Sequence, residues 1–241
     1  MNWFTPARRF NPDCVELMDR LDTNKTLLRE ELQVLEKANW QLGGHHLMLQ
    51  CIERFIGASE IKSLNVLDLA TGAADIPRAI VNWARKRQLP VTVTAVDNNP
   101  EILNIARELC RDWPEIRLEQ HDLRALPYAE NSFDLVLCSL AMHHFDSTDV
   151  VAILRRIQEL ARVGYIVNDL RRNWFCIWTT DLLTPLLTKS STFRNDAAQS
   201  CRAAFTVNEL RELAEQAGLN NFQIKRRHLF FHMTLEGLKT N

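Results

Sequence analysis

Acidic and small residues follow two apolar segments in the first half of this 241-residue chain. Asp68 lies in the apolar run 65–69, and the tight turn Ala70-Thr71-Gly72-Ala73-Ala74 follows it. Small side chains let a backbone approach a ligand closely, and a following helix points its positive end at that ligand. Asp97 ends the next β-branched run, with Asn98 after it, where a carboxylate can accept both hydroxyls of a ribose. The pattern indicates a nucleotide-like ligand, and a dinucleotide site shares both features.

Further polar residues follow the third and fourth apolar runs. In His121-Asp122-Leu123, Asp122 offers a carboxylate to an adenine amino group and Leu123 offers a backbone amide to the adenine ring. The segment Asn131–Phe145 (NSFDLVLCSLAMHHF) rises from a polar turn and ends in His143 and His144. We expect these groups to lie at the reacting end of the ligand.

Such residues need a scaffold that brings the ends of several strands together. The sequence predicts an α/β fold with a doubly wound, mostly parallel sheet, because β-branched runs alternate with amphipathic helical segments. The predicted strands are 65–69, 91–96, 116–119, 133–139 and 165–168, and the predicted helices are 76–87, 100–110 and 149–160. A helix over 206–217 is indicated by Thr206, Glu209 and Gly218. Runs 222–226 and 229–234 predict a closing hairpin.

Two flanking parts lack this alternation. Residues 1–60 are predicted to be a helical cap, and 61–241 to be the ligand-binding domain. The interruption at about 170–205 is too long for a plain connection, which predicts a lid over the substrate. Its apolar stretch 174–187 suits an acceptor tunnel, membrane-surface contact or dimer packing, but core packing against the N-terminal helices is the preferred interpretation.

Composition narrows the possible partners. A net charge of −1 implies no general attraction to nucleic acid or anionic lipid. The six cysteines form no CxxC pair and no leader is recognisable, so a cytoplasmic location is expected. The apolar stretch is too short for stable membrane insertion. No cluster shows metal-ligand spacing, so no metal is predicted. A nicotinamide enzyme normally needs more substrate domain than the residues after 160 supply.

Taken in order, the segments VLDLATGAAD, VTAVDNNPEIL, HDLRALPY and SFDLVLCSLAMHHF resemble class I S-adenosylmethionine-dependent methyltransferases over about residues 61–170. The resemblance implies a Rossmann-like, seven-stranded sheet with one antiparallel strand. It implies S-adenosylmethionine as cofactor and S-adenosylhomocysteine as product. The contacts it implies are Asp68 and the turn Ala70-Thr71-Gly72 around the methionine moiety, Asp97 and Asn98 at the ribose, Asp122 and Leu123 at the adenine, and Ser139 beside the sulfonium.

The turn departs from that family at two positions. Ala70 and Ala74 stand where glycines are commoner, and alanine disfavours positive φ. The difference predicts either a narrower cofactor site or an altered turn. These two alanines are also the only hints of a different class, a non-catalytic cofactor-binding protein.

The outer segments PDCVELMD, NWQLGGHH, NDLRRN and RNDAAQSCRAAFT resemble stand-alone bacterial methyltransferases encoded beside type III polyketide synthases, which are related to the quinone-biosynthesis methylases. This implies O-methylation of a phenolic polyketide or alkylresorcinol-type compound. C-methylation of a quinone precursor is the alternative, and a homodimer is possible. Cys138 lies inside a strand and is interpreted as a buried thiol.

A phenol has a pKa of about 10, so a nearby base would help to form the phenolate. His144 or His143 is the predicted base, and only one is expected to face the acceptor because consecutive residues point apart. Further residues of the insertion and its start are interpreted either as acceptor contacts or as surface ion pairs. They are Arg171, Arg194, Asp196 and Arg202.

Overall fold

The computed structural model describes residues 5–11, 16–20, 23–41, 43–57, 61–188, 190–227 and 232–239. The strands are β1 (Leu64–Leu69), β2 (Val91–Asp97), β3 (Ile116–Gln120), β4 (Phe133–Ser139), β5 (Ala161–Leu170), β6 (Phe222–Arg227) and β7 (His232–Leu238). The helices are α1 (Lys25–Gln41), α2 (Gly44–Gly57), α3 (Asp75–Lys86), α4 (Pro100–Leu109), α5 (Ser147–Leu160), α6 (Trp174–Leu187), α7 (Ser191–Ala203) and α8 (Val207–Gln216).

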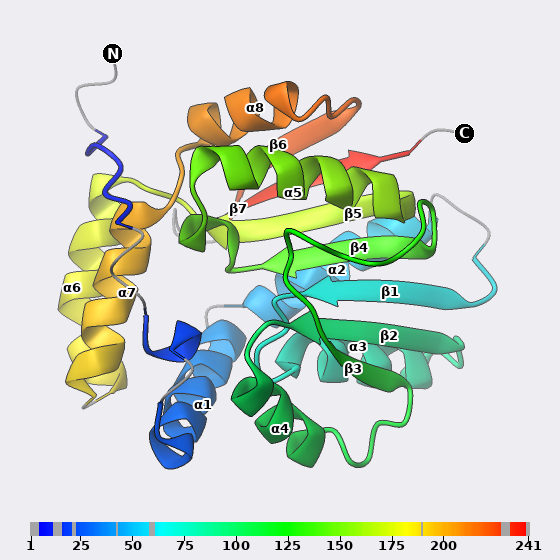
Figure 1. Cartoon of the computed structure of the whole chain (residues 1–241), viewed down its shortest axis with the longest axis horizontal. Coiled ribbons are helices and arrows are strands. Elements are labelled where there is room, and N and C mark those ends of the chain that lie inside the picture. Colours follow the sequence, from blue (N-terminus) through cyan, green and yellow to red (C-terminus); the bar gives the residue numbers. More distant parts are fainter. Residues whose placement is uncertain are drawn as a thin grey trace.

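The seven strands form one sheet in the order β3-β2-β1-β4-β5-β7-β6 (Figure 1). Neighbouring strands from β3 to β5 are parallel, whereas β7 is antiparallel to both β5 and β6. The predicted mostly parallel sheet with one antiparallel strand is therefore confirmed. The chain order reverses between β1 and β4, which is where ligands bind in open sheets of this kind.

Helices cover both faces of the sheet (Figure 1). On one face α5 and α8 pack on strand residues such as Val136 and Val167. On the other face α2 and α3 pack on residues such as Val66 and Leu135. An added Cβ on Gly164 would lie 2.2 Å from Phe55 of α2, so glycine is what lets this helix approach β5 closely.

The N-terminal part is only partly a cap. Helix α2 belongs to the layer under the sheet, whereas α1 lies beyond the carboxyl ends of the parallel strands together with α6 and α7 (Figure 1). Residues 5–11 contain no helix, and 17–19 form a single 3₁₀ turn. The segment before this turn is anchored by Arg8, whose Nε donates to the carbonyl of Ala203 at 2.6 Å. Its guanidinium also lies 3.9 Å above the ring of Phe205.

The helix ends that capping residues predicted agree with the structure. Asn99 accepts the N–H of Glu101 at 2.9 Å and Pro100 follows it, as expected for the start of α4. Thr206 and Glu209 form the predicted capping box of α8. The ends of β5 and β7 were predicted less well. Strand β5 is longer than 165–168, and β7 runs to Leu238 rather than ending at 234, while 228–231 lie outside the described residues.

Helix α6 packs on α7 through Cys176, Ile177 and Cys201. Its other side is exposed, with Trp174 at 57% and Trp178 at 61% of their full accessibility, and Phe175 and Leu182 are also exposed. Core packing of this whole segment was therefore a wrong expectation. The buried side of α6 includes Thr179, Thr180 and Thr184 while the large apolar residues are exposed, so hydrophobicity did not mark the face that is buried. Within the described parts of the chain, no helix is long and apolar enough to cross a membrane.

Candidate functional site

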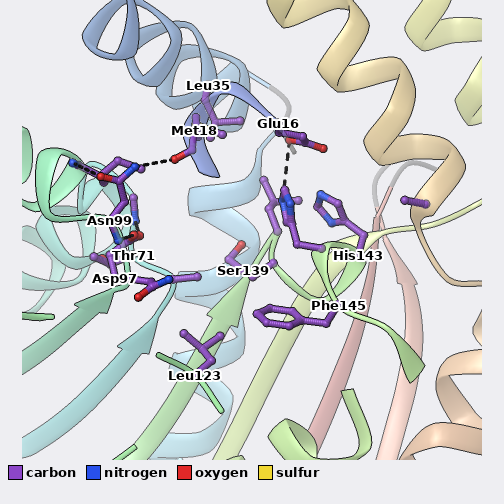
Figure 2. A pocket seen from close by; sticks show the side chains of 18 of the residues that line it. Glu16, Met18, Leu35, Thr71, Asp97, Asn99, Leu123, Ser139, His143 and Phe145 are labelled. Atoms are coloured by element: carbon purple, nitrogen blue, oxygen red, sulfur yellow. Dashed lines mark hydrogen bonds and ion pairs between the residues drawn. The ribbon is translucent and has the colours of Figure 1, made fainter. Parts of the chain in front are cut away.

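A cavity of about 940 Å³ lies at the carboxyl ends of β1, β2 and β4, beneath α1 and the N-terminal segment. Figure 2 shows some of the side chains that line it, with Asp97 and Leu123 on one side and His143 on the other. All nine residues predicted to contact the cofactor lie on its wall. They are Asp68, Ala70, Thr71, Gly72, Asp97, Asn98, Asp122, Leu123 and Ser139.

The turn after β1 has the left-handed conformation that glycine usually supplies. Ala70 has φ 53°, Gly72 has φ 57° and Ala74 has φ 57°. The turn is fixed by the N–H of Thr71, which donates to the carbonyl of Val96 at 2.8 Å. The two alanines thus preserve the turn rather than altering it, and each adopts a conformation that costs an L-residue about 1–2 kcal/mol.

Asp97 connects this turn to the start of α4. Its Oδ2 accepts the N–H of Gly72 at 2.9 Å, and its Oδ1 accepts the N–H of Asn99 at 3.0 Å. A carboxylate offers about four acceptor positions, and these two bonds use one on each oxygen. Asp97 is therefore held in one orientation at the cavity wall, where the sequence predicted a ribose contact.

Asp68 is almost fully buried, with 2% of its surface accessible. Burial is the main cause that raises the pKa of its carboxyl to about 7; Thr71 lowers this pKa, and the nearby charges of Asp75 and Asp97 raise it. A positively charged ligand in the cavity would favour the ionised form of Asp68.

Asp75, at the start of α3, is a second acid on the wall; it is partly buried and was not predicted from the sequence. Its Oδ2 lies 2.5 Å from His45 Nε2 and accepts from Asn39 Nδ2 at 2.9 Å. Burial alone would raise the pKa of Asp75, but His45, Asn39 and Arg78 together hold it below the usual value. The partners come from α1 and α2, so no pattern near Asp75 marks the interaction.

The predicted adenine contacts lie at the outer end of the cavity. Leu123 is buried, whereas the Asp122 carboxylate pairs with Arg124, whose Nε donates to Oδ1 at 3.0 Å. This pair lowers the pKa of Asp122. At the other end Ser139 Oγ accepts from Asn168 Nδ2 at 2.9 Å, which joins the ends of β4 and β5.

The two predicted histidines follow β4 and have different surroundings. His143 is 4% exposed, and its Nδ1 lies 2.6 Å from Asp169 Oδ1, while its backbone N–H donates to Asp169 Oδ2 at 3.0 Å. Burial would raise the pKa of Asp169, but the charge and hydrogen bond of His143 outweigh it and lower that pKa. His144 is more exposed, and its Nε2 lies 3.9 Å from Glu16 Oε2. The ring centroids of the two histidines are 4.2 Å apart.

A smaller cavity of about 180 Å³ shares His143, His144 and Leu140 with the first one and extends between α1, α6 and α7. Its wall is largely apolar and includes Leu35, Leu170, Phe193 and Ala197, together with threonines of α6.

The predicted acceptor residues divide into two pairs. Asp196 lines the smaller cavity and accepts the N–H of Leu17 at 3.1 Å, and Arg202 lines the larger one. Arg171 and Arg194 lie on the wall of neither of these two cavities. The side chain of Arg171 is buried, and Arg194 Nε donates back to the carbonyl of Ser190, at the start of its own helix, at 3.3 Å.

Carboxylates join the N-terminal part to the insertion over these cavities. Ser200 Oγ donates to Glu16 Oε1 at 2.5 Å, and Ser190 Oγ donates to Glu31 Oε1 at 2.5 Å. Burial raises the pKa of Glu31. The two outer parts of the chain, far apart in sequence, therefore close the site together.

Residues 66–164 match the family model described as "Methyltransferase domain". The demethylmenaquinone methyltransferase of Thermotoga maritima is 28% identical over 155 residues, which cover 64% of this chain and 59% of that enzyme. A SAM-dependent methyltransferase from Aquifex aeolicus has a similar structure, with a TM-score of 0.63, 13% identity, and coverage of 91% of this chain and all of that one. Human N-acetylserotonin methyltransferase, solved in complex with SAM, also has a TM-score of 0.63, at 15% identity, with coverage of 90% of this chain and 57% of that one.

Residues 66–164 are thus a methyltransferase domain, and the fold is that of class I S-adenosylmethionine-dependent methyltransferases. The predicted fold and family are thereby confirmed. S-adenosylmethionine is the cofactor of this class, and S-adenosylhomocysteine is what remains after methyl transfer.

The residues of the larger cavity fit this cofactor. Asp68, which is buried, and Asp75, which is partly buried, provide negative charge for a ligand that carries a sulfonium and an ammonium group. A Cβ added to Gly72 would have only Leu32 within 4 Å, at 3.9 Å, so the cavity is open in front of the turn. Asp97 offers a fixed carboxylate of the kind that accepts two hydroxyls.

The positive φ of Ala70 and Ala74 predicts that replacing them by glycine changes the free energy of unfolding by different amounts. Ala70→Gly should raise the free energy of unfolding by about 1 kcal/mol, because it removes an unfavourable left-handed alanine. Ala74→Gly should gain little, because the buried Ala74 methyl packs near Ala106 and Cys110 and its loss costs about 0.8 kcal/mol. Denaturant unfolding of both variants tests this, and a larger gain for Ala74→Gly would contradict it.

The raised pKa of Asp68 predicts pH-dependent cofactor binding. Below about pH 7 the Asp68 carboxyl is largely protonated, and binding of a cation must release that proton. Affinity for S-adenosylmethionine should therefore rise between pH 5.5 and 7, by up to about tenfold per pH unit, and level off above 7. Calorimetry across this range measures the slope. Asp68→Asn should bind more weakly and with a much flatter profile, and an equal slope in that variant would reject the assignment.

Proposed function

We propose that this protein transfers the methyl group of S-adenosylmethionine to a small-molecule acceptor in the apolar cavity. The proposed acceptor group is a phenolic hydroxyl of a polyketide or alkylresorcinol-type compound. The observation that carries the proposal is the arrangement of the two cavities, which meet at His143 and His144. A protein that only bound the cofactor in the larger cavity would not need the second, apolar cavity.

The size and lining of the smaller cavity support an aromatic acceptor. A cavity of about 150 Å³ lined by apolar side chains is known to hold benzene, so about 180 Å³ has room for one ring. Leu35, Leu170 and Phe193 provide apolar contacts for the ring. Asp196 and Arg202 are proposed to contact polar substituents, since each lies on a cavity wall.

The cofactor supplies an electrophilic methyl group, and the chain must supply a base and a fixed geometry. Because Nδ1 of His143 is hydrogen-bonded to Asp169, the other ring nitrogen, Nε2, is the one able to take the hydroxyl proton. Asp169 fixes the ring in place through a second bond, to the backbone N–H. Holding the acceptor oxygen in line with the methyl group supplies much of the remaining rate. His144 is proposed to assist beside it.

C-methylation of a quinone precursor is the second candidate. It is favoured by the similarity to the Thermotoga maritima enzyme, whose name gives demethylmenaquinone as its substrate. A reduced quinone ring carbon is already nucleophilic and needs a weaker base. The matched stretch covers 59% of that enzyme, so the likeness does not decide between the two acceptors.

Product analysis tests the proposal directly. Incubation with methyl-¹³C S-adenosylmethionine and a short-chain 5-alkylresorcinol should give a labelled methoxy signal in the NMR spectrum. A reduced naphthoquinone should be methylated more slowly. Labelling of the naphthoquinone ring carbon at the higher rate would instead favour the second candidate. Cofactor binding with no transfer to either compound would support a non-catalytic cofactor-binding protein.

Histidine variants test the proposed base. Replacement of both His143 and His144 by alanine should lower kcat by about 10²–10⁴-fold while leaving S-adenosylmethionine affinity nearly unchanged. Most of the loss should come from His143→Ala alone, because Asp169 orients only that ring.

His46→Ala is the matched control, since His46 contacts Gln50 on an exposed part of α2. It should keep full activity. Unchanged turnover in the double variant would remove both histidines from the mechanism.

A further inference from the structure

We propose that Glu16, His143 and His144 form a binding site for one divalent transition-metal ion of the Zn²⁺ type, and that this ion inhibits methyl transfer. The site is distinct from the cofactor contacts, although it lies on the wall where the two cavities meet. The inhibition rests on the proposed function, whereas the binding does not.

The geometry of the three side chains is close to that of a metal site. Each residue offers one ligand atom, and these atoms all lie within 4.8 Å of one another. Zinc bonds of about 2.0–2.2 Å in tetrahedral geometry separate ligand atoms by roughly 3.4 Å. Glu16 Oε2 and His144 Nε2 are already 3.9 Å apart, so rotations of side chains would be enough to bring the group together. Figure 2 shows Glu16 facing the neighbouring histidine rings.

Groups behind the ligands hold them as in known metal sites. A metal-binding histidine usually donates its other ring N–H to a carboxylate, which His143 does with Asp169 at 2.6 Å. Glu16 is similarly held, because its Oε1 accepts from Ser200 at 2.5 Å while Oε2 is the atom nearest His144. Glu16 is 7% exposed and His143 4%, so the group is also protected from bulk water.

The ligand types select the metal. Two imidazoles and one carboxylate suit Zn²⁺ and related transition metals, whereas Mg²⁺ and Ca²⁺ prefer oxygen ligands throughout. Three protein ligands leave a fourth position of a tetrahedral ion for water or an acceptor oxygen. No metal was predicted because Glu16 lies far along the chain from the histidine pair, so no ligand spacing marks this site.

Metal binding and the proposed catalysis compete for one atom. Nε2 of His143 is the nitrogen available to a metal, since Nδ1 is bonded to Asp169. A metal on Nε2 occupies the lone pair that would otherwise take the acceptor proton. The bound ion should therefore lower turnover without displacing S-adenosylmethionine from Asp68, Asp97 and the turn after β1.

Titration of the untagged full chain with ZnCl₂ against a chromophoric chelator tests the binding. We expect one ion per chain, and a visible Co²⁺ spectrum of the tetrahedral type. Glu16→Gln and His144→Ala should each weaken binding by at least about tenfold, and Asp169→Asn by about 10–100-fold. His46→Ala should bind as the native chain does. Absence of stoichiometric binding, or equal affinity in the ligand variants, would overturn the site.

The inhibition is measured separately, in the methyl-transfer assay with and without Zn²⁺. Turnover should fall in step with occupancy and recover on addition of chelator, and Glu16→Gln should need more Zn²⁺ for the same inhibition. Stoichiometric binding with unchanged turnover would overturn the inhibition and count against His143 as the base. If the chain transfers no methyl group at all, the proposed function fails and the titration alone decides the metal site.

Discussion

A parallel sheet whose chain order reverses between β1 and β4 sends the connections after these two strands to opposite sides. The space left between them is the large cavity, and every other functional feature depends on it. The loop after β1 carries the left-handed turn on one side. The loop after β4 carries the histidine pair on the other. Because the ends of both strands are fixed by the register of Asp68 with Leu137, the distance between the two loops is set by the backbone ladder.

The acids around this space differ in charge, although Asp68 and Asp97 are buried and Asp75 is partly buried. Asp75 is kept ionised by His45 and Asn39, whereas burial leaves Asp68 with a pKa of about 7. Asp97 uses backbone N–H groups as its partners. A pocket with three fully charged and unpaired carboxylates would be unstable without a ligand. Partial protonation and pairing reduce that repulsion while keeping negative charge available to a cation.

The sheet, and the residues that gather around the larger cavity, could be predicted because their signals are local. Asp68 and Asp97 lie at the ends of β1 and β2, and Asp122 follows the end of β3, and in a parallel sheet all such ends meet at one edge. The Asp75–His45 and His143–Asp169 contacts could not be predicted, because each joins residues separated by at least 26 positions along the chain. That Asp169 lies near the end of β4 could be inferred in part, because β4 and β5 were both predicted and their ends adjoin. The exposed face of α6 had no such signal, because its large apolar residues lie on the exposed side and threonines lie on the buried side.

The walls of the two cavities come from different parts of the chain. The larger cavity is built mainly from loops within 66–164, the stretch that matches the methyltransferase domain. The smaller one is enclosed chiefly by α1, α6 and α7, which lie outside that stretch. The residues of α6 that line the smaller cavity, such as Thr180 and Thr184, do not line the larger one, whereas α1 and α7 contribute to both walls. Substitutions in α6 would therefore reshape the proposed acceptor space while leaving the wall of the larger cavity unchanged, whereas a change at His143 or His144 would alter both spaces.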